Sequence, residues 1–283
     1  MDSREPSRTA RLVAGIRAAH QVIDGASVFK DPYARIILDA EAVAAADEHA
    51  RDPGTKPFRL FLAARSRFAE DCVAGEVDQG LRQIVILGAG LDTFGLRNPY
   101  RDIGLKVFEV DHPATQAWKQ ERFAASGINL PPELSFVPVD FERDDLAAKL
   151  AASDFRSNEP VLYIWLGVLP YLQRQTVFSL LRFVAASKEA GIIFDYSEPL
   201  ENYAPERRER ATAMAARVAE AGEPWLTLLD PEEIAGELTA IGFRHIEDLG
   251  LPDIARRYFG APANAPDSGA GPHVLFASKR LAS

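Results

Sequence analysis

A glycine turn is the first group of residues in this chain that could bind a ligand. The apolar run Ile84-Val85-Ile86-Leu87 leads directly into Gly88-Ala89-Gly90, and Leu91-Asp92-Thr93 follows. Glycine has no Cβ atom, so the backbone can turn sharply and a ligand can approach it closely. Free N–H groups at the start of a following helix would favour an anionic group. A dinucleotide-binding turn would carry a third small residue where Thr93 stands. The turn therefore favours a nucleoside cofactor without a pyrophosphate.

Two acidic residues end the next apolar run, about twenty residues further along the chain. The segment is Phe108-Glu109-Val110-Asp111. A carboxylate at such a strand end can accept hydrogen bonds from both hydroxyls of a ribose. Side chains alternate along a strand, so Glu109 and Asp111 share one face. Either of the two could therefore be the ribose ligand.

A third acidic residue, Asp140, ends the following apolar run and is itself followed by Phe141. An acid at this place can accept a hydrogen bond from an exocyclic amine, and the aromatic ring can flank a purine. Taken alone, the pair is typical of a structural turn. Its position gives it weight, because three successive strand ends then carry a glycine turn, a carboxylate and an acid–aromatic pair. That order is the one needed to line a single nucleoside site.

The elements that would position these residues follow from the apolar pattern. From Arg82 onward, short apolar runs alternate with helical stretches, which is typical of buried parallel strands with crossover helices. Strands are expected at 83–87, 106–110, 134–139, 161–166 and 191–196. Two more, at 244–249 and 273–279, have only the short, loop-rich stretch 250–272 between them. That pair could be antiparallel and place a reversed strand at the end of an otherwise parallel sheet.

The first eighty residues are expected to be helical. Leu12, Ile16, Ala19 and Ile23 are spaced so that they share one packing face. A second helix is expected to start at Asp31-Pro32 and to continue through residues 33–46, and a third to span 58–73.

The polar segment 198–225 interrupts the alternation of strands and helices. It is either a solvated surface helix, held by charge pairs at helical spacing, or a lid over a substrate. The second interpretation rests on its place directly after the carboxyl end of a strand, where ligands of open α/β sheets bind.

The composition is that of a globular protein, with 47% hydrophobic and 26% charged residues among 283. A net charge of −9 provides no basic surface for a phosphate backbone, so nucleic acid is disfavoured as the main partner and a small molecule or a protein is favoured. Cys72 is the lone cysteine, which predicts a reducing, cytoplasmic location and neither a disulfide nor a zinc cluster. No signal peptide and no membrane span of ~20 apolar residues is expected. The sequence leaves the oligomeric state unknown.

Together, these motifs resemble the leucine carboxyl methyltransferase-like family of S-adenosylmethionine-dependent methyltransferases, in its bacterial-type members. The resemblance extends from the N-terminus to about Gly242. It rests on Arg65-Ser66-Arg67, Leu87-Gly88-Ala89-Gly90-Leu91-Asp92-Thr93 with Arg97, Glu109-Val110-Asp111-His112-Pro113, Val139-Asp140-Phe141, and Trp165-Leu166-Gly167-Val168-Leu169-Pro170-Tyr171-Leu172. The second and third of these segments are fairly specific in combination.

The resemblance implies an α/β, class I methyltransferase (Rossmann-like) fold. This fold has a seven-stranded, mostly parallel sheet with one reversed strand, helices on both faces and, here, an N-terminal helical cap. Residues 1–283 would form a single domain. Its expected parts are a cap over 1–80, a cofactor-binding core over 81–197, a helical lid over 198–226, and a C-terminal helix with the last two strands over 227–283.

The resemblance also implies which residues would bind S-adenosylmethionine. Arg65 would pair with the methionine carboxylate of the cofactor, and the turn Gly88-Ala89-Gly90 would pass beneath the methionine end. Asp111, rather than Glu109, would bind the ribose. Asp140 and Phe141 would bind the adenine.

Leu166 departs from the family pattern. In members that methylate a protein phosphatase, a glutamate at this position contacts the amino group of the cofactor. With Leu166 beside the cofactor, that ammonium would need another acceptor, such as a backbone carbonyl at the strand end. The departure speaks against a phosphatase tail as the substrate and leaves the methyl acceptor open.

The predicted function is O-methylation of a small-molecule carboxylate or hydroxyl. Transfer from a sulfonium needs in-line approach of a nucleophile, and holding both reactants in place can supply most of the catalysis. A carboxylate nucleophile needs no base, whereas a hydroxyl would. His112 is the nearest candidate base among five scattered histidines, but it is more typical of a helix start or of surface packing, and no catalytic base is named. Tyr171 could orient the cofactor or the substrate, or merely pack. The five are His20, His49, His112, His245 and His273.

Two other functions compete with this one. An NAD(P)-dependent oxidoreductase would need room for a pyrophosphate and a proton donor near the hydride, and the sequence offers neither. A catalytically inactive nucleoside-binding protein is suggested by Leu166 in place of the acid. Tight NAD binding would indicate the first, and cofactor binding without turnover the second.

Overall fold

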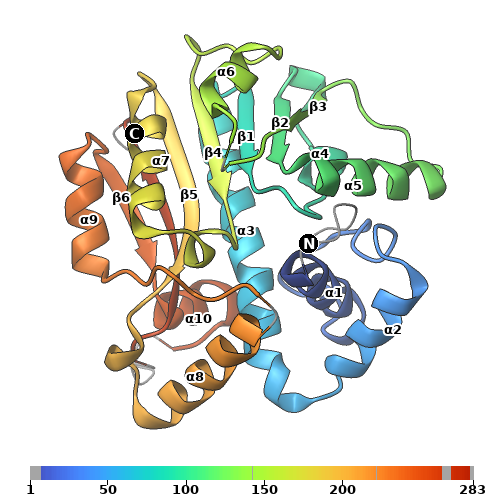
Figure 1. The fold of residues 1–283 in the computed structure, drawn as a ribbon, viewed down its shortest axis with the longest axis vertical. Coiled ribbons are helices and arrows are strands. Elements are labelled where there is room, and N and C mark those ends of the chain that lie inside the picture. The colour runs from blue at the N-terminus through green and yellow to red at the C-terminus, as the bar shows by residue number, and fades with distance from the viewer. Residues whose placement is uncertain (1–7, 142, 221, 263–268, 281–283) are drawn as a thin grey trace. The chain divides into compact units, whose positions relative to one another are not determined.

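The structure is a computed structural model that describes residues 8–141, 143–220, 222–262 and 269–280. The chain forms two compact units, Met1–Ser157 and Asn158–Ser283. The seven strands follow the order β3-β2-β1-β4-β5-β7-β6 in the sheet (Figure 1). Among the described residues, no helix combines the length and the apolar character that crossing a membrane requires.

The first unit contains three parallel strands, β1 (Gln83–Leu87), β2 (Lys106–Asp111) and β3 (Leu134–Pro138). Gln83 pairs with Lys106, and Val107 with Leu134. All five residues of β1 are buried, as expected for a parallel strand covered on both faces. The connections contain α4 (Phe94–Arg97), the 3₁₀ turn Arg101–Ile103, α5 (Pro113–Ala125) and, after β3, α6 (Leu146–Ala151).

Three helices precede these strands in the first unit: α1 (Arg8–Ile23), α2 (Ala40–His49) and α3 (Lys56–Asp78), with the 3₁₀ turn Pro53–Thr55 before α3. Helix α1 packs closely on α2, since a Cβ atom built on Gly15 would lie only 3.0 Å from the Cβ of Ala46. The expected packing stripe of α1 is correct only in its middle: Ile16 and Ala19 are buried, whereas Leu12 and Ile23 are 38% and 45% exposed.

The prediction that a helix starts at Asp31-Pro32 is wrong. Residues 32–38 form turns, and α2 begins at Ala40, behind the N-cap Asp39, whose Oδ1 accepts the N–H of Ala42 at 2.7 Å. Asp31 does accept the N–H of Tyr33 at 3.0 Å, as a helix cap would. Its carboxylate is also an ion-pair partner of Arg17 at 2.9 Å, so a tertiary contact takes the place of a helix start.

The second unit contains β4 (Val161–Trp165), β5 (Ala190–Ser197), β6 (His245–Leu249) and β7 (Pro272–Ser278). Strands β4 and β5 are parallel, and β7 is antiparallel to both β5 and β6. The predicted reversed strand is therefore confirmed, but it lies between β5 and β6 rather than at the end of the sheet. Large aromatic side chains, among them Tyr163, Trp165 and Phe194, fill the core of this unit.

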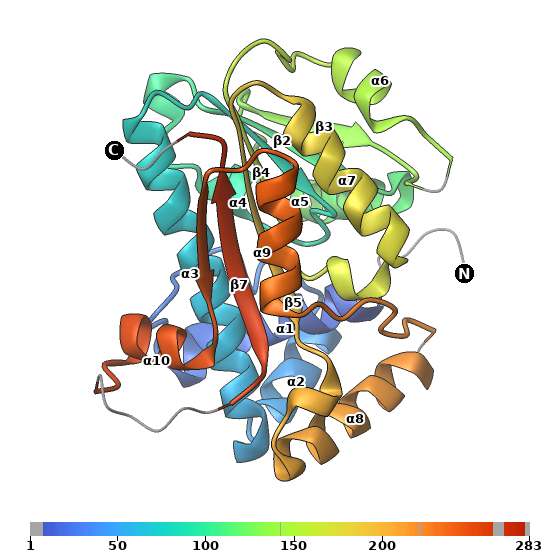
Figure 2. The ribbon, with the colours of Figure 1, turned by 90° about the vertical axis from the view of Figure 1, so that its left-hand side faces the viewer.

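The helices of the second unit are α7 (Arg174–Ala186), α8 (Pro205–Glu220), α9 (Pro231–Ala240) and α10 (Leu251–Phe259), with 3₁₀ turns at Leu169–Tyr171 and Leu200–Asn202. In both views α7 and α9 run alongside the strands, whereas α8 and α10 lie beyond one end of them (Figures 1 and 2). Helix α10 corrects the expectation that 250–272 is only loop-rich: Leu251-Pro252 starts a helix, and Gly260, at φ 66°, ends it.

Candidate cofactor site

The predicted glycine turn joins β1 to the short helix α4. Gly88 and Gly90 have φ angles of 65° and 47°, in the left-handed region that glycine enters without a steric cost. The N–H of Ala89 donates to the carbonyl of Val110 at 3.1 Å, and that of Asp92 donates to the carbonyl of Ala89 at 2.8 Å. The sequence predicted free N–H groups here that could bind an anion, but these two N–H groups already have acceptors within the chain. The turn is thus a preformed backbone surface without side chains at its two glycines.

The two acids at the end of β2 differ sharply in their surroundings. Glu109 is buried and pairs with the Nζ of Lys119 on α5 at 2.5 Å, with both side chains 1% exposed. Burial raises the pKa of Glu109 to about 7, although the ammonium of Lys119 lowers it. Gln116, also on α5, donates to the carbonyl of Glu109 at 2.7 Å. The contacts of Glu109 therefore attach α5 to β2.

Asp111, two residues further on, faces the glycine turn. Its Oδ2 accepts the N–H of Gly90 at 2.5 Å, and its Oδ1 accepts that of His112 at 2.6 Å. Burial raises the pKa of this half-buried carboxyl, and the two amide donors oppose that effect. Of the two acids that the sequence could not separate, only Asp111 contacts the turn.

Asp140 and Phe141 follow β3, as predicted. The N–H of Asp140 donates to Oδ2 of Asp144 at 2.9 Å, which closes a tight turn after the strand. The carboxylate of Asp140 lies 3.6 Å from Nε of Arg143, and the ring of Phe141 is 38% exposed. An exposed ring beside a half-buried acid fits the flat face and edge of a purine.

Arg65 and His112 are the other two predicted site residues of the first unit. Arg65 is on the buried face of α3, only 6% exposed. His112 is exposed and caps α5, because its Nδ1 accepts the N–H of Ala114 at 3.2 Å. As the acceptor nitrogen, Nδ1 carries no proton, so the neutral ring has its proton on Nε2.

Leu166 and Tyr171 belong to the second unit, at the carboxyl end of β4. Both are half-buried, and Tyr171 ends the 3₁₀ turn Leu169–Tyr171. Gly167 has a φ angle of 71°, and its N–H donates to Oδ1 of the buried Asp195 at 2.5 Å. Asp195 was missed from the sequence. Its place near the end of the next predicted strand could have indicated it.

Segment 226–227, which follows α8, is attached to the same loop. The N–H groups of Leu226 and Thr227 donate to the carbonyl of Pro170 at 2.6 and 3.2 Å, and Oγ1 of Thr227 donates to the carbonyl of Leu172 at 2.6 Å. No sequence motif signalled this contact.

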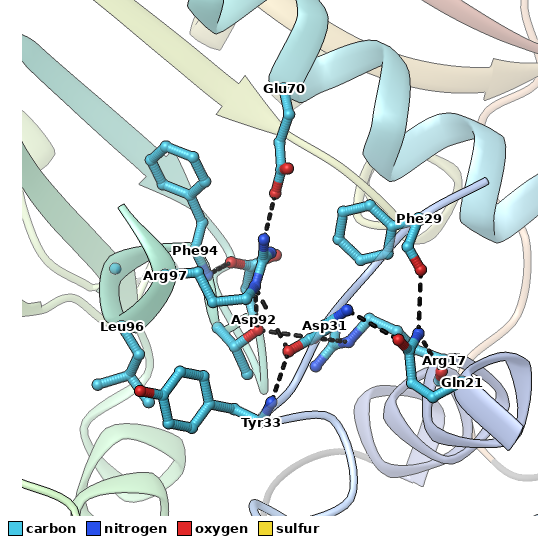
Figure 3. A network of polar contacts seen from close by, with 12 residues as sticks. Arg17, Gln21, Phe29, Asp31, Tyr33, Glu70, Asp92, Phe94, Leu96 and Arg97 are labelled. Atoms are coloured by element: carbon cyan, nitrogen blue, oxygen red, sulfur yellow. Dashed lines mark hydrogen bonds and ion pairs between the residues drawn. The ribbon is translucent and has the colours of Figure 1, made fainter. Parts of the chain in front are cut away.

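A buried polar network beside the glycine turn was also missed (Figure 3). Its centre is Asp31, which contacts Arg17, Thr93 and Arg97. Arg97 also pairs with Glu70 on α3 at 2.5 Å. Within the part of the chain that the structure describes, no group of His, Cys, Asp and Glu side chains could hold a metal ion.

Comparison with known proteins agrees with this arrangement. A Bacillus subtilis protein, YktD, described as a candidate S-adenosyl-L-methionine-dependent methyltransferase, is 34% identical over 198 residues, which cover 69% of this chain and 65% of that protein. A Mycobacterium marinum protein of the same description is 27% identical and covers 95% of this chain and 93% of its own length. The crystal structure of a DUF574 family protein from Streptomyces avermitilis has a TM-score of 0.62 at 17% identity, covers 97% of this chain and 98% of its own, and shows a shared fold.

The sheet order, with β7 reversed, and the glycine turn held by an acid at the end of β2 define a class I methyltransferase that uses S-adenosylmethionine. A model of the family described as leucine carboxyl methyltransferase matches residues 10–185. The chain belongs to this family.

Proposed function

We propose that this protein transfers the methyl group of S-adenosylmethionine to an oxygen of a small molecule, either a carboxylate or a hydroxyl. The observation that carries the proposal is the match of residues 10–185 to leucine carboxyl methyltransferase, because the acceptor in that description is a carboxylate. We favour a carboxylate here as well, since it is already a nucleophile at neutral pH and needs no base.

The ends of two strands, β2 and β3, would bind the nucleoside half of the cofactor. Asp111 would accept from the ribose hydroxyls, in addition to the N–H of Gly90 that it already accepts. Asp140 and Phe141 would bind the adenine through an acceptor oxygen and an exposed ring. These residues fit a single nucleoside, because each presents the kind of atom that its part of the ligand requires.

The methionine half would lie against the glycine turn and Arg65. The turn has no side chain at Gly88 or Gly90, so a bulky sulfonium group can approach its backbone. A guanidinium is suited to the methionine carboxylate, which it can bind through two parallel hydrogen bonds. Leu166 supplies no charge for the ammonium, which we assign to backbone carbonyls at the end of β4.

When bound, the cofactor supplies an electrophilic methyl group on a positively charged sulfur. The residues of the chain contribute binding and orientation, which for a bimolecular displacement can account for most of the rate. Tyr171 is a candidate for orienting the cofactor or the acceptor through its hydroxyl. We do not assign a catalytic base to His112, because its Nδ1 is already the acceptor of the helix cap.

Segment 198–226 would cover the acceptor. It contains the 3₁₀ turn Leu200–Asn202 and α8, in which Val218 is buried. It follows the carboxyl end of β5, the edge at which open α/β sheets bind ligands. We further propose that the protein acts in the cytoplasm, on the basis of its lone cysteine, Cys72, and that its partner is a small molecule rather than nucleic acid, on the basis of its charge of −9.

The test has two stages. Titration calorimetry with S-adenosylmethionine, S-adenosylhomocysteine and NAD should show binding of the two sulfur compounds and none of NAD, which separates a methyltransferase from an oxidoreductase. Turnover is then followed by mass spectrometry of a panel of acids and alcohols. A product that loses its new methyl group in mild base is an ester and supports the carboxylate, whereas a base-stable ether indicates a hydroxyl. Methylation of nitrogen or carbon alone would refute O-methylation.

A further inference from the structure

Asp31 is a fully buried carboxylate that is linked to the segment after the glycine turn. Its side chain is 0% exposed, and it accepts hydrogen bonds from Oγ1 of Thr93 at 2.7 Å and from the N–H of Tyr33 at 3.0 Å. Nε of Arg17 lies 2.9 Å from it and Nε of Arg97 3.4 Å (Figure 3). A buried charge is costly unless it is paired and hydrogen-bonded, and these partners meet both conditions for Asp31.

Three partners of Asp31, namely Arg17, Thr93 and Arg97, belong to or contact the segment that follows Gly90. The guanidinium of Arg17, on α1, also donates to the backbone carbonyl of Leu91. Thr93 lies two residues further on, and its hydroxyl accepts from Nε of Arg97 at 2.9 Å while it donates to Asp31. Residues 91–93 are therefore held at a backbone carbonyl and at a side chain by groups that converge on one carboxylate.

The same segment continues into the groups that face the proposed ligand. Gly90, directly before Leu91, donates its N–H to Asp111. Asp92, between the two held positions, accepts the N–H of Phe94 at 2.6 Å and so starts α4. Burial alone would raise the pKa of Asp92, but Arg17 and Arg97 lower it, so the arginines that pair with Asp31 also keep this neighbour ionised.

We propose that Asp31 is a positioning residue for the cofactor turn. Through Arg17 and Thr93 it fixes the backbone of residues 91–93, and thereby the orientation in which Gly88-Ala89-Gly90 and Asp111 meet the cofactor. On this basis, the N-terminal helices help to position the backbone of the cofactor site. The inference rests on the proposed assignment of the turn to the cofactor, but it does not depend on which acceptor is methylated.

The chain offers a matched control in Asp24. This carboxylate is 9% exposed and is bound at two points by Arg59 on α3, with Nε 2.6 Å from Oδ2 and Nη2 3.1 Å from Oδ1. Nδ1 of His20 lies 3.0 Å from the same carboxylate. Asp24 is therefore a second buried aspartate paired with an arginine of the N-terminal part of the chain, and its partners, Arg59 and His20, do not belong to residues 88–93. A general loosening of these helices would affect Asp24→Asn and Asp31→Asn alike, whereas an effect on the turn would be confined to Asp31→Asn.

The experiment measures binding of S-adenosylhomocysteine by calorimetry, at a temperature where thermal melts show every variant folded. Asp31→Asn is expected to weaken binding at least tenfold and Asp24→Asn less than twofold. Equal losses in the two variants, or no loss in Asp31→Asn, would overturn the proposal. Binding by the wild type with no turnover of any acceptor would refute the proposed methyl transfer but leave this inference standing.

Thr93 provides a second, independent readout. Thr93→Val removes only the hydroxyl that links Asp31 to the turn, and Thr93→Ser restores it, so the first should weaken binding and the second should not. If Asp31 acts through Thr93, the effects of Asp31→Asn and Thr93→Val are non-additive, whereas those of Asp24→Asn and Thr93→Val add. If Asp31→Asn does not fold, the Thr93 pair decides: wild-type affinity in Thr93→Val would contradict the proposal.

Discussion

The carboxylate of Asp111 accepts the N–H of Gly90 at 2.5 Å, so the end of β2 and the glycine turn after β1 are joined by one hydrogen bond. This bond orients the carboxylate toward the backbone that would lie beneath the cofactor. It also uses only one of the lone pairs of Oδ2, so the same carboxylate can accept from a ribose hydroxyl.

Replacing Asp111 by asparagine should therefore weaken cofactor binding. The substitution keeps the shape of the side chain but removes the charge that strengthens its hydrogen bonds. We expect a loss of about 1–3 kcal/mol in the binding free energy of S-adenosylhomocysteine, measured by calorimetry. Glu109→Gln is the paired control, because that buried side chain contacts Lys119 and not the turn. Equal losses in the two variants would argue against the assignment of Asp111.

Gly90→Ala should destabilise the fold through its backbone conformation. Gly90 has φ 47°, a region that costs an L-residue roughly 1–2 kcal/mol. Steric overlap is not the cause, since a Cβ atom there would lie at an ordinary 3.5 Å from the Cβ of Ala10. Denaturant unfolding measures the effect. Gly75→Ala and Gly236→Ala, within α3 and α9 with nothing within 4 Å of the new Cβ, should instead be neutral or stabilising.

The buried pair Glu109–Lys119 predicts a dependence of stability on pH. Burial raises the pKa of Glu109 from 4.5 to about 7, so between these values the folded state binds more protons than the unfolded state. The contribution of Glu109 to stability therefore falls as the pH rises through this interval. Glu109→Gln should remove that slope from a series of unfolding curves at different pH. An unchanged slope would show that another group titrates there.

Lys119→Met tests the same pair from its other side. The variant leaves Glu109 buried without its ammonium, and breaking such a pair costs roughly 3–5 kcal/mol when the remaining group is charged. Without the ammonium, the pKa of Glu109 rises above its wild-type value of about 7. The loss of unfolding free energy should therefore be small below pH 7, where the carboxyl is protonated in both proteins, and should grow as the pH rises above that value. The double variant Glu109→Gln with Lys119→Met should recover most of the loss. A cost independent of pH would indicate lost packing instead.

In the second unit, His273 makes a contribution to stability that also falls as the pH rises. Burial lowers its pKa, but Asp248 at 2.9 Å from Nδ1 and Glu198 at 3.1 Å from Nε2 outweigh burial and raise it above 6.5. The charged ring therefore stabilises the fold fully below pH 6.5, and this contribution is lost as the pH rises through the folded-state pKa. Tyr196, which stacks on the ring at 4.9 Å, also donates its hydroxyl to Asp248 at 2.5 Å.

The comparison of His273→Gln with wild type, by unfolding at several pH values, measures that contribution. The difference in unfolding free energy should shrink as the pH rises. A titration of the His273 ring by NMR that gave a pKa below 6.5 would contradict the prediction.

Strands were predictable where burial alone determines them. The apolar run Ile84–Leu87, which makes up β1 together with the buried Gln83, indicated this strand because both faces of a parallel strand are covered. The glycine turn was equally predictable from the sequence, since few residues other than glycine adopt the positive φ angles of Gly88 and Gly90. Local patterns could not distinguish Glu109 from Asp111, because the distinction depends on Lys119, which lies on the next helix.

Asp31 is a residue whose structure could not be predicted from its neighbours in the sequence. Its local signal, an acid before proline, is that of a helix start, and its backbone contact with Tyr33 even resembles one. The contacts that decide its structure come from Arg17, Thr93 and Arg97, up to 66 positions away in the chain, which is the separation of residues 31 and 97. Helix α10 was missed for a local reason, because its amphipathic stretch is short, lies between Gly250 and Gly260 and has Pro252 in its first turn.

The segment that carries α8 is attached to the second unit at both of its ends. Before it, the N–H of Glu198 donates to the carbonyl of Gly271 at 3.1 Å, and after it Leu226 and Thr227 bind the carbonyl of Pro170. A loop with both ends fixed can change in length or sequence at a small entropic cost, since doubling its length adds only about 0.6 kcal/mol to closure. Insertions, deletions and exchanges between these anchors can therefore accumulate without disturbing the strands. If this segment covers the acceptor, as proposed, such changes would alter the acceptor while the cofactor stays the same.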